Sequence, residues 1–486
     1  MISSRTSSNP SPPYKGHSVT KSMVYEPIKI PPFEKLLSIL LGALLFLVSS
    51  SCTAPKVGSG YIAKRICSEV FVAGRDPKAE YLPEIEILSS FTSFEVDKLA
   101  NSVTARTAGF GEHTASWHEG FGCALTYKTS SQSNQKQYLE SKSGQNPLNA
   151  SEQLKFSTQS SYPSKDSKIA KLDQVLDWAF KEHIPEKSKR TRAVIILHKG
   201  DLVAERYAKG FGPETLFLGW SAAKSVTHAI VGAAVQKGLV EISRPIGFKE
   251  WEDDTRSKIT LDHLLRMVSG LEFNESFFPP SDLTDMLFLE PDMGKRAAEE
   301  QLEYEIGSHW SYSSGSSLLI MRYLREIQDD ESYHRFPYET LFDPIGAHTA
   351  VFETDTSGTF VGSSYLYMSA RDWARFGLLY AQDGVWQGNR IMPRGWAAYG
   401  CSPSSVAPRG QYGAHWWVNG GEKRKPEERM FPSLPGDTCM ATGFEKQLVV
   451  LVPGHDLIIV RLGVTTDPRN FPVEEFIAKI IEAVSS

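Results

Sequence analysis

One stretch of the chain carries small and apolar residues around its whole circumference. Between residues 219 and 235 these residues fall on every face of a 3.6-residue helix, and Lys224 is the one charged side chain. The pattern predicts a helix that is buried on all sides. A lysine is almost never buried without a partner, so Lys224 either reaches solvent from the first helical turn or has a functional reason to stay inside.

The spacing of apolar residues before and after this stretch predicts a sheet that is covered by helices. Residues 169–180 and 473–484 show the spacing of amphipathic helices. Residues 198–201 form a turn between two apolar runs and predict a β-hairpin. Strands are expected over residues 193–197, 202–207, 412–418, 447–452 and 457–462. The strands before the Lys224 stretch and those near the end of the chain would together form one sheet with helices on both sides. This is an α/β fold of the α+β type.

The region between these strands is predicted to be mostly helical. Thr260 is a suitable N-cap for a helix over residues 261–268 that stops at Gly270. An apolar run predicts a helix over residues 318–327. Residues 369–372 are close to a capping box and start a further helix.

The N-terminus predicts export of the chain. Residues 1–35 are rich in Ser, Pro and Lys and are typical of a disordered tail. The apolar run 36–48 spans about thirteen residues, which suits the core of a signal peptide better than a membrane span of roughly twenty. Cleavage before Cys52 would resemble lipoprotein processing, an uncleaved run would anchor the chain, and a buried core helix is the remaining alternative. Residues 36–52 are therefore expected to be a signal peptide or membrane anchor, and the protein to be periplasmic or bound to the cell envelope.

Composition divides the rest of the chain. Residues 53–128 carry their own signals of regular structure and form an N-terminal extension. Residues 129–165 are rich in Ser, Gln, Lys and Asn and lose apolar periodicity, which is typical of a linker. The domain that holds the sheet and the Lys224 helix is expected over residues 166–486.

Charge and motif content exclude several classes of function. Hydrophobic residues make up 41% and charged residues 22% of the 486 residues, as in an ordinary globular protein. The net charge of −5, without a long basic patch, gives no reason to expect a nucleic-acid partner. No phosphate-binding loop, zinc-ligand spacing or dinucleotide fingerprint stands where a strand, turn and helix would support it, so neither a metal nor a cofactor is expected.

Four cysteines remain once Cys52 is assigned to the export segment. In an oxidising compartment they can pair, and Cys67 with Cys123 is favoured because both lie in the N-terminal extension. Cys401 and Cys439 are the other two. Free buried thiols are the alternative.

Ser221 and Lys224 form a candidate nucleophile and base. The pattern Ser-x-x-Lys occurs three times, but the matches at Ser18 and Ser133 lie in polar stretches without periodicity. At spacing i, i+3 the two side chains share a helix face, with Cβ atoms roughly 5–6 Å apart. Serine is a weak nucleophile until a base removes its proton, and burial lowers the pKa of a lysine toward the range where it acts as that base.

A second candidate segment precedes the helix predicted over residues 318–327. Tyr312 would share the proton relay, and Ser314 would hydrogen-bond the lysine ammonium. Taken alone, this segment is explained more simply as a serine run that caps the helix.

A third candidate segment is Ala-Thr-Gly-Phe at residues 441–444, on or beside a strand. Gly443 lets a substrate approach the backbone, and the backbone N–H of Phe444 would form an oxyanion hole with that of Ser221. A β-bulge glycine is the alternative.

In this order the three segments resemble the serine β-lactamase and penicillin-recognising hydrolase superfamily, class C branch. The surrounding phrases look closer to the 6-aminohexanoate-dimer hydrolase and esterase group. These phrases are Leu218–Val226, Leu264–Leu271, Gly362–Tyr365 and Arg371–Gly377. The resemblance covers roughly residues 166–486 and implies a β-lactamase/transpeptidase-like antiparallel sheet flanked by helices, with a mostly helical subdomain.

The resemblance also implies roles for individual residues. Ser221 would be the acylated nucleophile, Lys224 its base and Tyr312 a second general acid/base. The backbone N–H groups of Ser221 and Phe444 would form the oxyanion hole. Substrate-binding positions would be Ser314, Thr442 and Gly443.

Two departures from the superfamily pattern narrow the expected substrate. Ser314 stands where class C β-lactamases commonly have asparagine, and Ala441 replaces the lysine that would bind a β-lactam carboxylate. The sequence therefore predicts a serine hydrolase of small amides or esters. A D,D-peptidase or weak β-lactamase, and a catalytically idle cell-wall ligand-binding protein, are the alternatives. His228, about 10 Å along the helix from Ser221, is expected to be a core or surface histidine.

Overall fold

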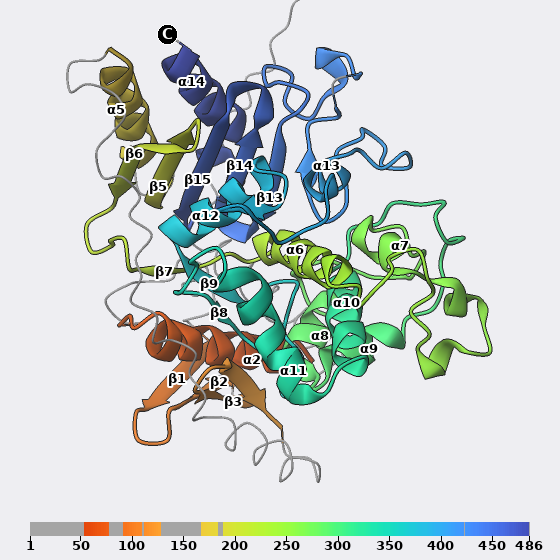
Figure 1. Ribbon diagram of the computed structural model, residues 1–486. Coiled ribbons are helices and arrows are strands. Elements are labelled where there is room, and N and C mark those ends of the chain that lie inside the picture. The colour runs from red at the N-terminus through yellow and green to blue at the C-terminus, as the bar shows by residue number, and fades with distance from the viewer. Residues whose placement is uncertain are drawn as a thin grey trace, which may run out of the picture. The chain divides into compact units, whose positions relative to one another are not determined.

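The computed structural model describes residues 53–76, 91–108, 111–127, 167–182, 188–421 and 423–485 (Figure 1). The predicted tail, apolar run and linker lie outside these described residues. Within them, no helix combines the length and the apolar character needed to cross a membrane.

The centre of the fold is a six-stranded sheet in which every neighbouring pair of strands is antiparallel. In spatial order the strands are β12 (Trp417–Val418), β13 (Cys439–Gly443), β14 (Gln447–Val452), β15 (Leu457–Gly463), β5 (Thr191–His198) and β6 (Asp201–Tyr207). β15 pairs with β5, so segments far apart in the sequence meet in the middle of the sheet (Figure 1). The predicted hairpin is confirmed, with Lys199 and Gly200 turning it at left-handed φ values of 55° and 85°.

Helices cover both faces of this sheet. They are α5 (Ser167–Phe180), α14 (Val473–Ser485), α12 (Ala370–Ala381) and α6 (Ala222–Gln236). α5 and α14 share an apolar core with one face of the sheet, which confirms both predicted helices. α12 packs on the other face, where a Cβ added to Gly377 would stand 2.8 Å from the side chain of Ile458. α6 packs against β13 and is buried from Ala222 to Ala234, as the sequence pattern predicts.

A helical subdomain lies beside the sheet (Figure 1). It contains α7 (Leu261–Leu265), α8 (Asp282–Leu289), α9 (Met293–Ala298), α10 (Ser314–Glu326) and α11 (Asp330–Pro337), which continues as a π-helical turn (Tyr338–Phe342). The remaining short elements are α13 (Trp396–Gly400), β7 (Leu216–Leu218), β8 (Val351–Phe352), β9 (Leu366–Ser369), β10 (Val385–Trp386) and β11 (Asn389–Arg390). α10 packs against both α6 and α9, so it connects the subdomain to the centre of the fold.

The prediction of a strand over residues 412–418 is wrong for most of that range. Only Trp417 and Val418 are in a strand. Before them the chain folds back, with the N–H of Gly413 bonded to the C=O of Trp416 at 2.8 Å and His415 at a left-handed φ of 57°. A short apolar run does not distinguish a strand from a buried turn, because both place aromatic side chains in the core.

The helix expected over residues 261–268 is shorter than predicted. It stops at Leu265 because Met267, two residues on, takes a left-handed φ of 60°. Thr260 caps its N-terminus as predicted, in a reciprocal box with His263.

α10 begins at Ser314, earlier than the start predicted at residue 318. The hydroxyl of Ser313 accepts a hydrogen bond from the N–H of Ser316 and so caps the helix. Ser314 is therefore part of the first helical turn rather than of the preceding loop.

The N-terminal extension forms one helix and one small sheet. They are α2 (Thr53–Cys67), which ends in a π-helical turn (Ser68–Val72), and the antiparallel strands β1 (Thr92–Asp97), β2 (Ser102–Thr107), β3 (Gly111–His118) and β4 (Gly122–Thr126). α2 lies between this sheet and α8, where a Cβ added to Gly60 would stand 2.8 Å from the carbonyl oxygen of Phe288. Apolar residues of α2, the small sheet and α6 belong to one continuous core.

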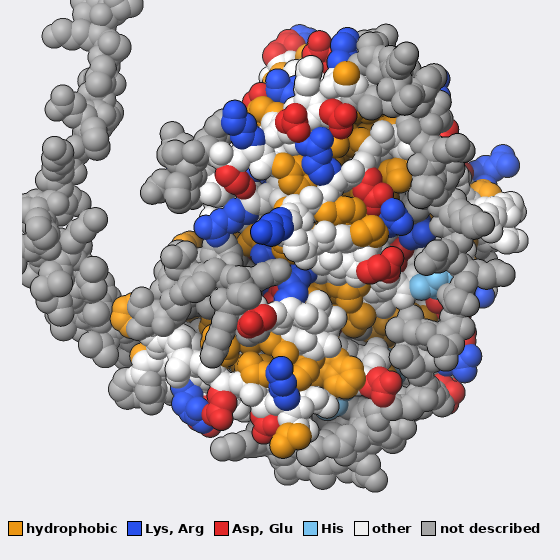
Figure 2. Space-filling view, turned by 90° about the vertical axis from the view of Figure 1, so that its left-hand side faces the viewer, with side chains coloured by type: hydrophobic (Ala, Val, Ile, Leu, Met, Phe, Trp, Pro, Cys, Tyr) orange, Lys and Arg blue, Asp and Glu red, His pale blue; other side chains and the backbone are white. Residues whose placement is uncertain are grey.

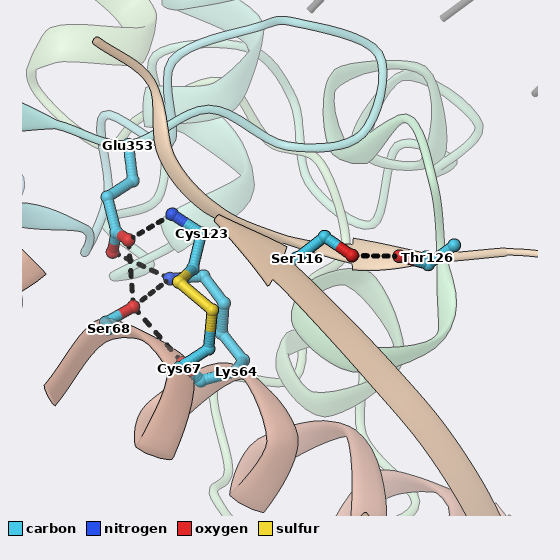
Figure 3. The surroundings of a disulfide bond; sticks show 7 residues. All are labelled: Lys64, Cys67, Ser68, Ser116, Cys123, Thr126 and Glu353. Atoms are coloured by element: carbon cyan, nitrogen blue, oxygen red, sulfur yellow. Dashed lines mark hydrogen bonds and ion pairs between the residues drawn. A yellow bond between two sulfur atoms is a disulfide. The ribbon is translucent and has the colours of Figure 1, made fainter. Parts of the chain in front are cut away.

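A buried carboxylate ties this extension to the rest of the protein. Glu353 accepts hydrogen bonds from Lys64 Nζ at 2.6 Å and from Ser68 Oγ at 2.8 Å. It also accepts one from the backbone N–H of Cys123 at 2.7 Å (Figure 3). Burial lowers the pKa of the Lys64 ammonium, and the charge of Glu353 opposes that shift. Since both charged groups lie inside the protein, each depends on the other for its stability.

The four cysteines of the described residues form two disulfides. Cys67 at the end of α2 is bonded to Cys123 of β4, which confirms the favoured pairing (Figure 3). Cys401, directly after α13, is bonded to Cys439 of β13. The free-thiol alternative is wrong for both pairs.

Charged side chains of both signs are interspersed over the face drawn in Figure 2. The described residues include exposed ion pairs, such as Arg106 with Glu112 at 2.6 Å. In the described part of the chain, no three His, Cys, Asp or Glu side chains gather in a way that suits a metal ion.

We predict that Glu353→Gln destabilises the protein strongly, because it leaves the buried Lys64 ammonium without its counter-charge. The expected loss in the free energy of unfolding is about 3–5 kcal/mol. Urea unfolding of the full chain, followed by tryptophan fluorescence, measures it. The matched control is Glu112→Gln, which removes an exposed pair and should cost less than about 1 kcal/mol. Equal small losses for the two variants would show that the buried pair does not hold the extension in place.

Candidate active site

The turn before α6 presents Ser221. Trp220 has a left-handed φ of 48°, so the chain turns sharply between β7 and α6. Gly219 fits only because it has no side chain, since an added Cβ would stand 2.2 Å from the ring of Trp373. Ser221 occupies the N-cap position of α6. Among the described residues, its hydroxyl accepts no hydrogen bond from the backbone N–H groups of the first helical turn. The side chain is partly exposed and thus available for chemistry.

Lys224 lies one turn further on and is only 1% exposed. Its Nζ donates to the Oγ of Ser221 at 3.1 Å and to the Oγ of Ser314 at 3.0 Å. A third hydrogen bond, 3.1 Å long, goes to the backbone carbonyl of Ser363. Burial lowers the pKa of this ammonium to about 8, against the opposing charge of Glu275. The alternative in which Lys224 reaches solvent is therefore wrong.

Tyr312 lies close to both Ser221 and Lys224. Its hydroxyl lies near that of Ser221, which acts to lower its pKa, and its ring centroid lies 4.9 Å from Lys224 Nζ. Burial, together with the charge of Glu275, raises the pKa of the phenol well above its usual value. The ring packs beside Tyr412 and Trp417 at centroid distances of 5.7 and 5.5 Å. The structure thus brings the serine, the lysine and the tyrosine together.

Glu275 is a site residue that the sequence did not indicate. It accepts hydrogen bonds from the backbone N–H of Ser314 at 2.7 Å and from the Oγ of Ser314 at 2.6 Å. Because Ser314 starts α10, the carboxylate also lies at the positive end of the helix dipole. Burial raises the pKa of Glu275, while Lys224 and Ser314 act in the opposite direction. A lone glutamate in a loop has no local pattern that would have revealed this role.

The end of β13 lies beside the Ser221 turn. A Cβ added to Gly443 would stand 2.1 Å from the carbonyl oxygen of Gly219, so the two backbones touch. The ring of Phe444 meets that of Trp220 edge to face, with centroids 5.7 Å apart. β13 keeps a regular register with β14 up to Gly443, so the alternative of a β-bulge at this glycine is wrong. Thr442, directly before it, is partly exposed.

Arg461 supports the backbone after Phe444 and was also missed. Glu445 and Lys446, which follow Phe444, both take left-handed φ values, of 61° and 65°. Arg461 donates to their carbonyl oxygens at 3.1 and 2.9 Å. The arginine is fully buried, and burial lowers its pKa to about 9. It lies in an apolar strand, where an arginine gives no signal that distinguishes a buried role from an exposed one.

His228 lies away from this site, as expected. It is fully buried, its Nδ1 is 2.6 Å from the hydroxyl of Tyr380, and its ring stacks on Trp396 at 4.8 Å. It is therefore a core histidine.

Comparisons with known proteins agree with this architecture. Residues 176–480, well over half of the chain, match the family model described as Beta-lactamase. The curated 6-aminohexanoate-dimer hydrolase of Paenarthrobacter ureafaciens is 22% identical over 306 residues, which are 57% of this chain and 74% of that protein.

Two solved structures have similar folds. EstCE1, a hydrolase with promiscuous acyltransferase activity, has a TM-score of 0.53 at 15% identity, over 66% of this chain and 99% of its own. A family VIII carboxylesterase has a TM-score of 0.51 at 14% identity, over 65% of this chain and 97% of its own. These likenesses confirm the predicted β-lactamase/transpeptidase-like fold, and the match to the family model confirms the resemblance. The chain therefore belongs to the Beta-lactamase family of hydrolases.

Proposed function

We propose that the protein is a serine hydrolase that cleaves small amides or esters through an acyl-enzyme on Ser221. The observation that carries the proposal is the buried ammonium of Lys224, 3.1 Å from the Ser221 hydroxyl oxygen. A structural lysine would be paired directly with a carboxylate or would extend to solvent, whereas Lys224 is held by two hydroxyl groups and a carbonyl.

Lys224 acts as the base in this proposal. When the amine is neutral, two N–H bonds donate to Ser314 Oγ and Ser363 O, which leaves the lone pair directed at Ser221 Oγ. A pKa of about 8 leaves a useful fraction of the amine neutral near physiological pH. The amine takes the hydroxyl proton as Oγ bonds to the substrate carbonyl carbon.

Tyr312 acts as the acid for the leaving group. Its raised pKa keeps the phenol protonated, and its position next to Ser221 and Lys224 places that proton near the reacting carbon. When the carbonyl oxygen becomes negative, the backbone N–H groups of Ser221 and Phe444 stabilise it. Ser221 precedes the first residue of α6, so its N–H lies before the intrahelical hydrogen bonds begin. A water molecule then releases the acyl group by the reverse proton movements.

The substrate is proposed to be uncharged next to the scissile bond. Ala441 is buried and supplies a methyl group where a β-lactam-binding relative would supply an ammonium. Ser314, Thr442 and Gly443 remain the proposed substrate-binding positions. The names of the relatives, an amide hydrolase and two ester or acyl-transfer enzymes, support amide or ester chemistry.

We also propose that the protein is exported and works in the cell envelope. Two disulfides support an oxidising compartment, since such bonds are rare in the cytosol. The apolar run 36–48 would direct the export or anchor the chain.

The proposed nucleophile and base can be tested with a fluorophosphonate probe and p-nitrophenyl acetate. Wild type should be labelled at Ser221 and turn over the ester, and Ser221→Ala should lose both properties. Lys224→Ala should lower kcat/KM by about 10²–10⁴-fold, the usual contribution of a general base. The matched control is Lys237→Ala, an exposed lysine at the far end of α6, which should behave as wild type. Peptide mass spectrometry locates the label.

Three outcomes would contradict the proposal in different ways. Absence of both labelling and turnover in wild type would favour an idle ligand-binding protein. Faster hydrolysis of nitrocefin than of the ester would favour a β-lactamase or D,D-peptidase. Full activity of Lys224→Ala would remove the lysine from its assigned role.

The pH dependence of kcat/KM tests the electrostatic role of Glu275. The rate should rise with pH as Lys224 loses its proton, with a midpoint near pH 8. The charge of Glu275 raises the pKa of Lys224, so Glu275→Gln should move this midpoint to lower pH. Glutamine keeps one acceptor for Ser314, and Glu272→Gln, an exposed glutamate of the same loop, is the control. An unchanged midpoint, or one moved to higher pH, would show that the carboxylate does not act on the lysine.

A further inference from the structure

Exposed aromatic rings lie close to the candidate site. The described residues include seven large apolar side chains that are markedly exposed, namely Phe91, Leu99, Leu239, Phe277, Phe278, Tyr304 and Phe444. Three of these seven lie near the site: Phe277 and Phe278 belong to the loop that carries Glu275, and Phe444 directly follows β13. Single exposed apolar residues are normal, but a group of them next to a candidate site indicates a binding surface.

These rings form a continuous row that starts at the nucleophile turn. Phe277 stacks on Phe444 with centroids 4.8 Å apart and planes inclined by 30°. Phe444 meets Trp220 edge to face at 5.7 Å, and Trp220 directly precedes Ser221. We call Trp220, Phe444 and Phe277 the aromatic wall. Trp220 is buried, whereas Phe444 is 36% and Phe277 46% exposed, so the wall runs outward from the site to the surface.

The loop that carries Phe277 is fixed on both sides of this residue. On one side, Glu275 accepts two hydrogen bonds from Ser314. Beyond Phe277, the hydroxyl of Ser281 donates back across the loop to the carbonyl of Ser276 at 2.6 Å. The wall is therefore a built surface that can bind a ligand without first being ordered.

The position of the wall identifies the part of the substrate it contacts. The leaving group must lie beside Tyr312, whose ring neighbours are Tyr412 and Trp417. The wall has different members and includes Phe444, whose backbone N–H is the proposed oxyanion donor. The acyl group, on the other side of the scissile carbonyl, is the part of the substrate that extends along the wall.

We propose that the aromatic wall is an acyl-binding subsite for an apolar alkyl or aryl group, so that the preferred substrates are neutral amides or esters of medium-chain or aromatic acids. This assignment rests on the proposed function. It follows from the exposed ring surfaces of Phe444 and Phe277, since a ring face binds a hydrocarbon chain by removing both from water.

The acyl-chain dependence of hydrolysis tests this subsite. For p-nitrophenyl acetate, butyrate and hexanoate, wild-type kcat/KM should rise with chain length, at least about tenfold from acetate to hexanoate. Phe277→Ala should lower the hexanoate-to-acetate ratio of kcat/KM about tenfold, mostly through KM. The matched control is Phe91→Ala, which removes a ring that is 59% exposed and lies in the N-terminal extension; its ratio should equal that of wild type.

Binding to the Ser221→Ala variant separates the subsite from catalysis. Titration calorimetry with p-nitrophenyl hexanoate should show at least about tenfold tighter binding than with the acetate, and adding Phe277→Ala should abolish the difference. Hexanoate selectivity in binding, with no turnover by wild type, would support the subsite and contradict the proposed hydrolase. Turnover without any dependence on Phe277, or equal binding of both esters, would overturn the subsite and leave the hydrolase intact.

Discussion

The burial of one ammonium group is the constraint on which the candidate site depends. Lys224 lies in the first turn of a helix that is buried on every side, so its charge must be met by groups inside the protein. Ser221 reaches it along the same helix, Ser314 from the start of α10, and Ser363 from the loop before β9. Each of these partners belongs to a different packed element. α6, the helical subdomain and the loop before β9 therefore have to meet at this lysine for its hydrogen bonds to be satisfied.

A second buried lysine offers a comparison for the proposed base. Burial lowers the pKa of Lys64 as it does that of Lys224. Lys64, however, donates directly to a carboxylate at 2.6 Å, which holds the proton on the amine. In the candidate site the carboxylate of Glu275 is bonded to Ser314 instead, and Ser314 is bonded to the lysine. Because Ser314 stands between the two charges, Glu275 stabilises the ammonium without a direct bond that would hold the proton on the amine. The proposed role of Lys224 as a base requires a proton that can be released.

Local patterns predicted the parts of the structure that depend on short sequence separations. The sequence predicts the Ser221–Lys224 pair because residues i and i+3 share a helix face. It predicts the β5–β6 hairpin because the residues between the two strands are typical of a tight turn. Glu275 and Ser314 are 39 residues apart, and Lys64 and Glu353 are 289 apart, so no periodicity connects either pair. The turn at Gly413 likewise depends on distant packing, because an added Cβ there would stand 2.0 Å from the carbonyl of Gly400. A single sequence carries no information on such contacts.

The N-terminal extension contributes to the site although it lies outside the residues that match the family. The guanidinium carbon of Arg65 in α2 lies 5.7 Å from the ring centroid of Trp220, the residue with the left-handed turn before Ser221. The ammonium of Lys64 lies 4.0 Å from the ring centroid of Tyr365, which in turn packs 6.3 Å from Trp220. Trp220 thus contacts α2 through Arg65 and the turn after β13 through Phe444. Because a tryptophan at a left-handed φ is retained only when its surroundings fix it, the extension helps to hold the backbone that presents the candidate nucleophile.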